Sequence, residues 1–274
     1  MNGTRISGAR IAAIQLVCRD VAATAAFYQA AFGCSSPSPP DLMLGEQSIE
    51  LVATKSALRI FAPANSAAFQ HFAIVVSDID KAMQKLSGCR GWNPISRAGP
   101  QALPLASGGA TAFKFRDPEG HPLELLRFPD GTRPPAWRDG RPGTFLGIDH
   151  SAITVANTAR SVAFYRELGL VVLSRQVNRG SEQEQLDDLD GAVVEVTGLA
   201  SPTGAAPHLE LLCYQKPDVI DEVAAMDDPR STRLILEGED CDRATIPAKR
   251  SATLVDKTWM RDPDGHVLAF DSGG

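Results

Sequence analysis

The segment Ile148-Asp-His-Ser-Ala-Ile-Thr-Val-Ala-Asn157 decides the fold, because its pattern occurs elsewhere in the chain. Residues 11–20 read Ile-Ala-Ala-Ile-Gln-Leu-Val-Cys-Arg-Asp, and in both places a Phe-Tyr pair follows seven and eight residues after the final Asn or Asp. Both runs are apolar and rich in branched residues, as in a strand, and Asn or Asp is a favoured N-cap for a following helix. The sequence therefore predicts a repeated unit that begins with a strand and a helix.

Two further copies complete a fourfold repeat. One starts at Phe69-Gln-His-Phe-Ala-Ile-Val-Val-Ser-Asp78, and a weaker one reads Arg233-Leu-Ile-Leu-Glu-Gly-Glu-Asp240 followed by residues 241–244. The second and fourth units close with the turns Asp117-Pro-Glu-Gly-His121 and Asp262-Pro-Asp-Gly-His266, in which Pro presets φ and Gly accepts a positive φ. Each unit is predicted to consist of a strand, a helix and then two or three strands.

The repeat divides the 274 residues into two halves of similar size. The first half, residues 1–130, holds modules at about 9–66 and 67–130. The second half, residues 146–274, holds modules at about 146–216 and 230–274. The connecting segment 131–145 is rich in Pro, Gly and Arg and has no periodicity, which is typical of a linker.

Composition excludes several classes of function. The net charge of −6 and the lack of a basic stripe argue against binding to nucleic acid, and no apolar run is long enough to span a membrane. The five cysteines are an odd number without a CxxC pair, which argues against a disulfide framework or a thiolate zinc site. We therefore expect a cytoplasmic protein, a monomer or homodimer, that binds neither nucleic acid nor a membrane.

The repeated motifs resemble those of the vicinal oxygen chelate superfamily, which contains glyoxalases, bleomycin-resistance proteins and extradiol dioxygenases. The resemblance is carried by His71 and His150 at the same position of their strands, by the Phe-Tyr helix and by Asp117-Pro-Glu-Gly-His-Pro-Leu-Glu124. It covers nearly the whole chain. It implies an α+β fold of four βαβββ modules that form two half-open barrels, with metal ligands from the first and last strands of each module.

Transferring the family's ligand positions distinguishes the four modules. In chain order, the first-strand position holds Ala13, His71, His150 and Arg233, and the last-strand position holds Glu50, Glu124, Glu210 and Ala269. Modules two and three are complete in this respect. If modules two and three pair, one barrel has a full ligand set and the other has none, whereas pairing one with two and three with four leaves two partial sites. We favour the pairing of two with three and of one with four.

The resemblance implies that His71, Glu124, His150 and Glu210 bind one divalent metal ion, which could be Fe, Mn, Ni, Co or Zn. It also implies proton transfer in a lyase, isomerase or epimerase reaction on a small substrate with vicinal oxygens, with Glu124 or Glu210 as the base. The choice between these glutamates stays open. The alternatives are an extradiol-type Fe(II) dioxygenase and a metal-free binding protein of the bleomycin-resistance type.

Other polar residues receive more modest roles. His121 and His266 follow the same turn in complete and incomplete modules, which favours a structural role. His208 lies two residues before Glu210 and so on the same strand face, as a reserve ligand or a substrate contact. The acidic run 181–190 is interpreted as a solvated loop or short helix, with a lid over the site as the alternative. In the incomplete barrel, Glu50 is predicted to pair with Arg233, because a buried carboxylate needs a cation.

Overall fold

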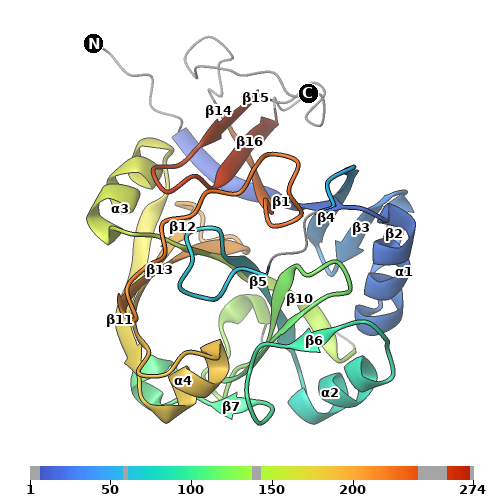
Figure 1. The fold of residues 1–274 in the computed structure, drawn as a ribbon, viewed down its shortest axis with the longest axis horizontal. Coiled ribbons are helices and arrows are strands. Elements are labelled where there is room, and N and C mark those ends of the chain that lie inside the picture. Colours follow the sequence, from blue (N-terminus) through green and yellow to red (C-terminus); the bar gives the residue numbers. More distant parts are fainter. Residues whose placement is uncertain (1–6, 58–60, 138–142, 240–257, 272–274) are drawn as a thin grey trace.

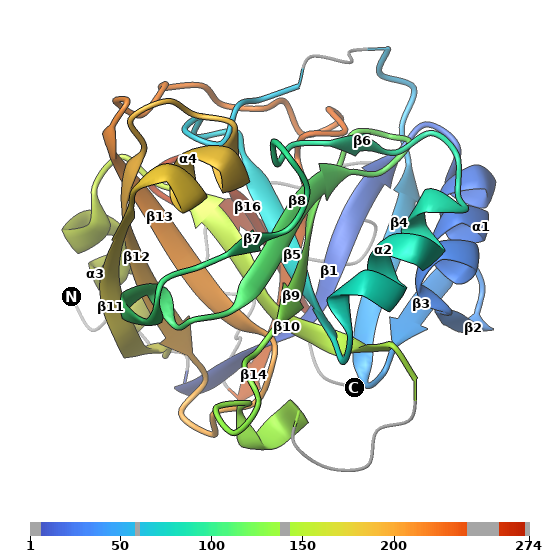
Figure 2. The same cartoon turned by 90° about the horizontal axis from the view of Figure 1, so that it is seen from below.

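The computed structural model describes residues 7–57, 61–137, 143–239 and 258–271 (Figures 1 and 2). The helix expected in the fourth module, around residues 241–244, lies outside the described residues. None of the described helices combines the length and the apolar character needed to cross a bilayer. The described helices are α1 (Val21–Phe32), α2 (Ile79–Ser87), α3 (Thr158–Glu167) and α4 (Ser181–Asp187), with short 3-10 turns η1 (Leu105–Ser107) and η2 (Pro135–Trp137).

The larger sheet combines the second and third modules. Its strands run in the order β11-β12-β13-β10-β5-β9-β8-β6, and β7 also pairs with β8. In chain order they are β5 (Gln70–Val76), β6 (Asn93–Pro94), β7 (Gln101–Ala102), β8 (Thr111–Arg116), β9 (Pro122–Arg127), β10 (Phe145–Thr154), β11 (Val171–Arg179), β12 (Val193–Ala200) and β13 (His208–Lys216). The two modules meet where β5 runs antiparallel to β10.

The smaller sheet combines the first and fourth modules in the order β15-β16-β14-β1-β4-β3-β2. Its strands are β1 (Ser7–Cys18), β2 (Ser35–Ser38), β3 (Asp41–Leu44), β4 (Gln47–Ala53), β14 (Arg233–Glu239), β15 (Thr258–Arg261) and β16 (Val267–Asp271). Its modules meet where β1 runs antiparallel to β14. The pairing of modules two with three and of one with four is therefore confirmed, and the described strands close neither sheet into a full barrel.

Strand alternation separates a core face from a ligand face on the central strands. On β5, Phe72 and Ile74 enter the main hydrophobic core, and on β9 Leu123 and Leu125 do the same. Successive side chains of a strand point to opposite faces, so His71 and the single glutamate between the two leucines point to the other face. The apolar runs that the sequence shows are thus buried on both sides, on one by the core and on the other around a polar site.

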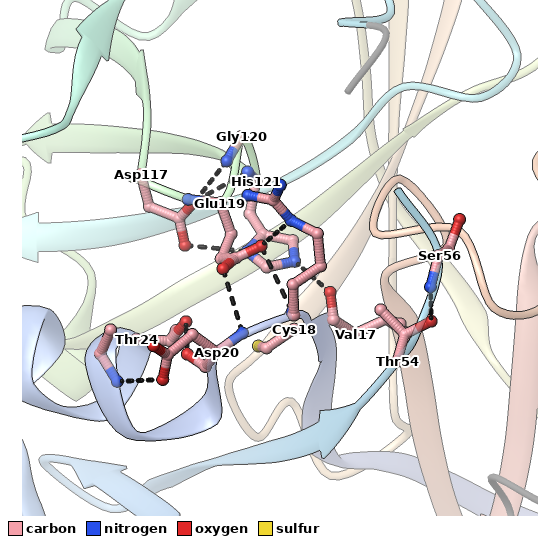
Figure 3. Close-up of polar contacts among 12 residues, drawn as sticks. Val17, Cys18, Asp20, Thr24, Thr54, Ser56, Asp117, Glu119, Gly120 and His121 are labelled. Atoms are coloured by element: carbon pink, nitrogen blue, oxygen red, sulfur yellow. Dashed lines mark hydrogen bonds and ion pairs between the residues drawn. The ribbon is translucent and has the colours of Figure 1, made fainter. Parts of the chain in front are cut away.

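The turn that closes the second module holds the first module in place, as Figure 3 shows. Asp117 accepts backbone hydrogen bonds from Glu119, Gly120 and His121, and the Tyr28 hydroxyl of α1 donates to its other oxygen at 3.2 Å. The ring of His121 lies 2.8 Å from Asp117 through Nδ1 and 3.1 Å from the Val17 carbonyl oxygen through Nε2. His121 therefore links the turn to the end of β1.

The second half repeats this arrangement. The Tyr165 hydroxyl of α3 donates to Asp262 at 3.0 Å, and His266 Nε2 lies 2.8 Å from the Thr154 carbonyl oxygen at the end of β10. Asp264 accepts hydrogen bonds from α3 and from the residues just before it, including one from the Ala156 amide at 3.0 Å. Each Phe-Tyr helix is thus bound by the Asp-Pro-x-Gly-His turn of the other module in the same half, while the sheets join modules from different halves.

In the smaller sheet, the positions equivalent to the ligands contain an apolar cluster and a polar row. Ala13, Ile235 and Ala269 form the cluster. In the row, the Gln15 amide donates to Glu50 at 2.8 Å, and Arg233 donates to the Gln15 oxygen at 2.6 Å. Glu50 and Arg233 therefore lie on one sheet, as expected, and Gln15 connects them. A direct ion pair between the two stays a prediction.

A candidate metal centre in the larger sheet

Three of the four expected ligands converge at the junction of modules two and three. His71 on β5, Glu124 on β9 and His150 on β10 each offer a ligand atom, and these atoms all lie within 4.8 Å of one another. Donor atoms bound to one zinc-sized ion at about 2.1 Å lie no more than about 4.2 Å apart, so small side-chain rotations would let all three bind a common ion. The fourth, Glu210 on β13, has its Oε2 3.6 Å from His150 Nε2.

His71 shows most clearly that this donor set fits a cation. The residue is buried, and its two ring nitrogens find no hydrogen-bond partner among the described residues. Its Nε2 lies 3.0 Å from Glu124 Oε2 without the alignment of a hydrogen bond. Burial and the nearby Lys114 ammonium lower the pKa of His71, which favours the neutral imidazole that binds metals. A buried imidazole in this state is suited to a metal ion between itself and the carboxylate.

His150 is oriented by its neighbour in the sequence. Its Nδ1 lies 3.1 Å from Asp149 Oδ2, while Trp137 Nε1 donates to Asp149 Oδ1 at 2.7 Å. Burial opposes a charge on His150, but Glu210 and Asp149 outweigh it and raise the pKa of His150 to about 9. A divalent ion that binds Nε2 would displace that proton. A carboxylate on the far nitrogen of a metal-binding imidazole is a common way to fix its orientation.

Glu210 lies at the more open side of the group. Its side chain is 22% exposed, compared with 7% for Glu124. Burial would raise the pKa of Glu210, but His150 and His208 lower it below its usual value. His208 Nε2 lies 3.6 Å from Glu210 Oε1, which agrees with its expected place on the same strand face. Asp149, His150 and His208 form a second group of possible ligands that shares His150.

A cavity of about 370 Å³ opens onto these residues. His71, Glu124, His150 and Glu210 all line it, together with many apolar side chains from both modules and from the segment before β10. The apolar lining includes Leu103, Leu126, Phe128, Leu173, Val196 and Leu212. The size and the mixture of an apolar wall with a few convergent polar groups are typical of a site for a small organic molecule.

The structure adds a buried ion pair that the sequence analysis did not assign to the site. Lys114 on β8 lines the cavity and donates to Asp187 Oδ1 at 2.6 Å, and its Nζ lies 4.0 Å from Glu124 Oε2. Asp187 also accepts hydrogen bonds from Gln183 and from the Tyr214 hydroxyl. A lone lysine in the apolar strand 111–116 was the available signal, equivalent to the lone glutamates that were recognised.

The acidic run 181–190 begins with a short helix, as one interpretation expected, but this helix is not simply solvated. Gln183, Leu186 and Asp187 of α4 are buried, and Gln183 and Leu186 line the cavity. The helix is attached to module two, because the Ser96 hydroxyl donates to the Leu186 carbonyl oxygen at 3.0 Å. The run therefore forms part of the wall of the site.

Comparisons with known proteins give the family and similar folds. The model of the Glyoxalase/Bleomycin resistance protein/Dioxygenase superfamily matches residues 10–125 and 147–270. Glyoxalase I from Zea mays is similar in structure, with a TM-score of 0.61 and 16% identity over 96% of this chain and 92% of that one. A putative dioxygenase from Bacillus subtilis has a TM-score of 0.53 and 10% identity over 99% and 87% of the two chains. No curated protein matched in a sequence search.

Proposed function

Because this chain belongs to the Glyoxalase/Bleomycin resistance protein/Dioxygenase superfamily, we propose that it is a metal-dependent enzyme of the lyase, isomerase or epimerase type. Its substrate is a small molecule with adjacent oxygens, and its reaction is a proton transfer. The observation that carries the proposal is the convergence of His71, Glu124 and His150, with Glu210 beside them, on the wall of one cavity.

In this proposal, some of the residues bind the metal and another transfers the proton. His71, Glu124 and His150 would hold a divalent ion, which would supply polarisation of a substrate oxygen and so raise the acidity of the adjacent C–H group. Glu124 is buried against His71 and Lys114, so it is poorly placed to move. Glu210 is more exposed and lies 3.6 Å from the rings of both His150 and His208, so it is the better-placed base for the proton next to the substrate carbonyl.

The first test is metal stoichiometry. We expect one equivalent of a divalent metal per chain, and loss of binding in His71→Ala and in His150→Ala without loss of the fold. Glu50→Gln is the matched control, because Glu50 occupies the equivalent strand position in the smaller sheet and should leave metal content unchanged. Two equivalents per chain would contradict the single site. No metal after reconstitution would contradict the proposal and favour a metal-free binding protein.

The second test separates the two glutamates. Glu210→Gln should retain the metal and lose turnover by about a hundredfold or more, which is the usual size of a general-base effect. Glu124→Gln should lower metal affinity as well as turnover. If Glu124→Gln retained metal and lost turnover while Glu210→Gln did not, the two roles would be reversed.

A second candidate function has a specific observation in its favour. His71, His150 and Glu124 are two histidines and one carboxylate, the set that Fe(II) oxygenases use. An Fe(II) dioxygenase would require iron and would consume oxygen with its substrate. Oxygen uptake by the iron-loaded protein, measured against protein loaded with zinc, nickel or manganese, distinguishes this alternative from proton transfer.

A further inference from the structure

Lys114 occupies a position in the site that proton transfer alone does not explain. It lies directly opposite Glu124 in the antiparallel pairing of β8 with β9, so the two side chains share a face. Its neighbours Phe113 and Phe115 point into the main core, which leaves Lys114 pointing toward the cavity. The residue is only 3% exposed. Its ammonium pairs with Asp187 at 2.6 Å and is thereby fixed beside the proposed ligands.

A gain in stability alone does not explain this charge. A buried ion pair such as Lys114 with Asp187 is often no more stable than apolar residues of similar size, because both ions lose their hydration. The ammonium also lies 4.0 Å from Glu124, where it opposes a divalent ion that needs the same carboxylate. Metal binding therefore does not explain a lysine at this position, and the cavity is the other feature that its ammonium faces.

The ammonium retains donors that can reach a ligand. It carries three N–H groups, and among the described residues Asp187 Oδ1 is the acceptor within hydrogen-bond range. Asp187 is itself held by Gln183 and Tyr214, so the position of the ammonium is fixed before any ligand arrives. Preorganised donors of this kind lose little entropy on binding.

We infer that Lys114 binds an anionic oxygen of the substrate, so that the site selects small monoanions with an apolar body. No other lysine or arginine occurs among the described residues that line the cavity. The one ammonium group among these residues suits one carboxylate, enolate or phenolate, and it offers nothing further to a second anionic group. The inference deepens the proposed function and depends on it only for the metal beside Glu124.

The experiment measures ligand binding without metal or turnover. Phenylacetate and phenylacetamide have nearly the same shape and differ in charge, and their affinities for the metal-free protein can be compared by calorimetry. The wild type should prefer phenylacetate by at least about tenfold, which corresponds to one charge-assisted hydrogen bond. Lys114→Met should lose this preference, and Lys85→Met, at an exposed lysine of α2, should retain it.

A purely structural role for Lys114 predicts different results. Cobalt affinity should be higher in Lys114→Met than in the wild type, because the charge that opposes the ion is gone, whereas loss of a purely structural contact would lower it. If the wild type does not distinguish the two probes, or if Lys114→Met still prefers phenylacetate, the inference is wrong. Lys114→Gln gives the same reading if Lys114→Met does not fold. Failure of the wild type to bind cobalt would contradict the proposed function alone, because the probes are measured without metal.

Discussion

Asp149 shows how one residue acts on the site through another. It is buried, and its two oxygens contact Trp137 and His150. Loss of a carboxylate that orients a metal-binding imidazole typically lowers metal affinity by about 10- to 100-fold. We predict this loss for Asp149→Asn in a competition titration with a chelator, with Asp130→Asn at an exposed site as the control. Unchanged affinity would show that the fold alone orients His150.

Arg233 occupies, in the smaller sheet, the first-strand position that His71 occupies in the larger sheet. It is fully buried, and it donates hydrogen bonds to Gln15 and to the Met226 carbonyl oxygen. Burial and the nearby Arg261 lower the pKa of Arg233 to about 10.

Arg233→Ala should lower the free energy of unfolding by about 3–5 kcal/mol, because it removes a buried cation from its partners. Metal content should not change, since the residue lies in the other sheet. Arg10→Ala, which breaks an exposed pair with Glu237, should cost about 1 kcal/mol or less. Loss of metal from Arg233→Ala would mean that the two sheets do not separate these roles.

At the scale of elements, the charged His121 ring contacts Asp117 of the turn and the Val17 carbonyl oxygen of β1, and Asp117 in turn binds Tyr28 of α1. The Val17 carbonyl can only accept a hydrogen bond, and the Asp117 carboxylate accepts from the other ring nitrogen, so both nitrogens carry protons. Burial opposes this charge, but Asp117 outweighs it and raises the pKa of His121. A raised pKa stabilises the fold fully below the unfolded value of about 6.5, and this contribution disappears as pH rises through the folded value.

We therefore predict that the difference in free energy of unfolding between the wild type and His121→Gln becomes smaller as pH rises above about 6.5. The free energy of unfolding, measured with denaturant at several pH values for both proteins, checks this. Tyr28 and Glu119 also face this turn, and both are unchanged in the comparison. If the difference in free energy of unfolding between the two proteins did not change with pH, His121 would be neutral in the folded protein.

At the scale of the whole molecule, two kinds of contact join different pairs of modules. The sheets join modules of different halves, whereas the turns bind helices of the same half. No module can leave without breaking both kinds of contact. We predict that unfolding occurs in one transition, in which the tryptophan fluorescence and the far-ultraviolet circular dichroism change together. Separate transitions for the two signals would contradict this prediction.

Metal binding should stabilise the whole molecule. Metal at a hundred times its dissociation constant should raise the free energy of unfolding of the wild type by about 2.7 kcal/mol. His71→Ala should lack this stabilisation.

Much of the fold and of the candidate site could be predicted from the repeat in the sequence. Each module lies on a continuous stretch of chain, so the spacing between strand, cap and Phe-Tyr pair could be counted from the sequence. The inventory of His71, Glu124, His150 and Glu210 also indicated which modules share a sheet, because only that pairing assembles a complete set. The strand register agrees with the counting, since Glu124 lies opposite Ala73 and Glu210 opposite Ala152.

What only the tertiary structure decided are contacts between modules that no repeat spacing encodes. Lys114 and Asp187 are 73 residues apart, and Gln15 and Arg233 are 218 apart, so their meeting depends on how each sheet curls and on where α4 packs. The turn and the Phe-Tyr helix were recognised separately, yet their mutual hydrogen bonds were not expected. Local spacing follows from the chain's own geometry, whereas such long-range partners are selected by the packing of the whole molecule, in which each buried polar group must find its complement.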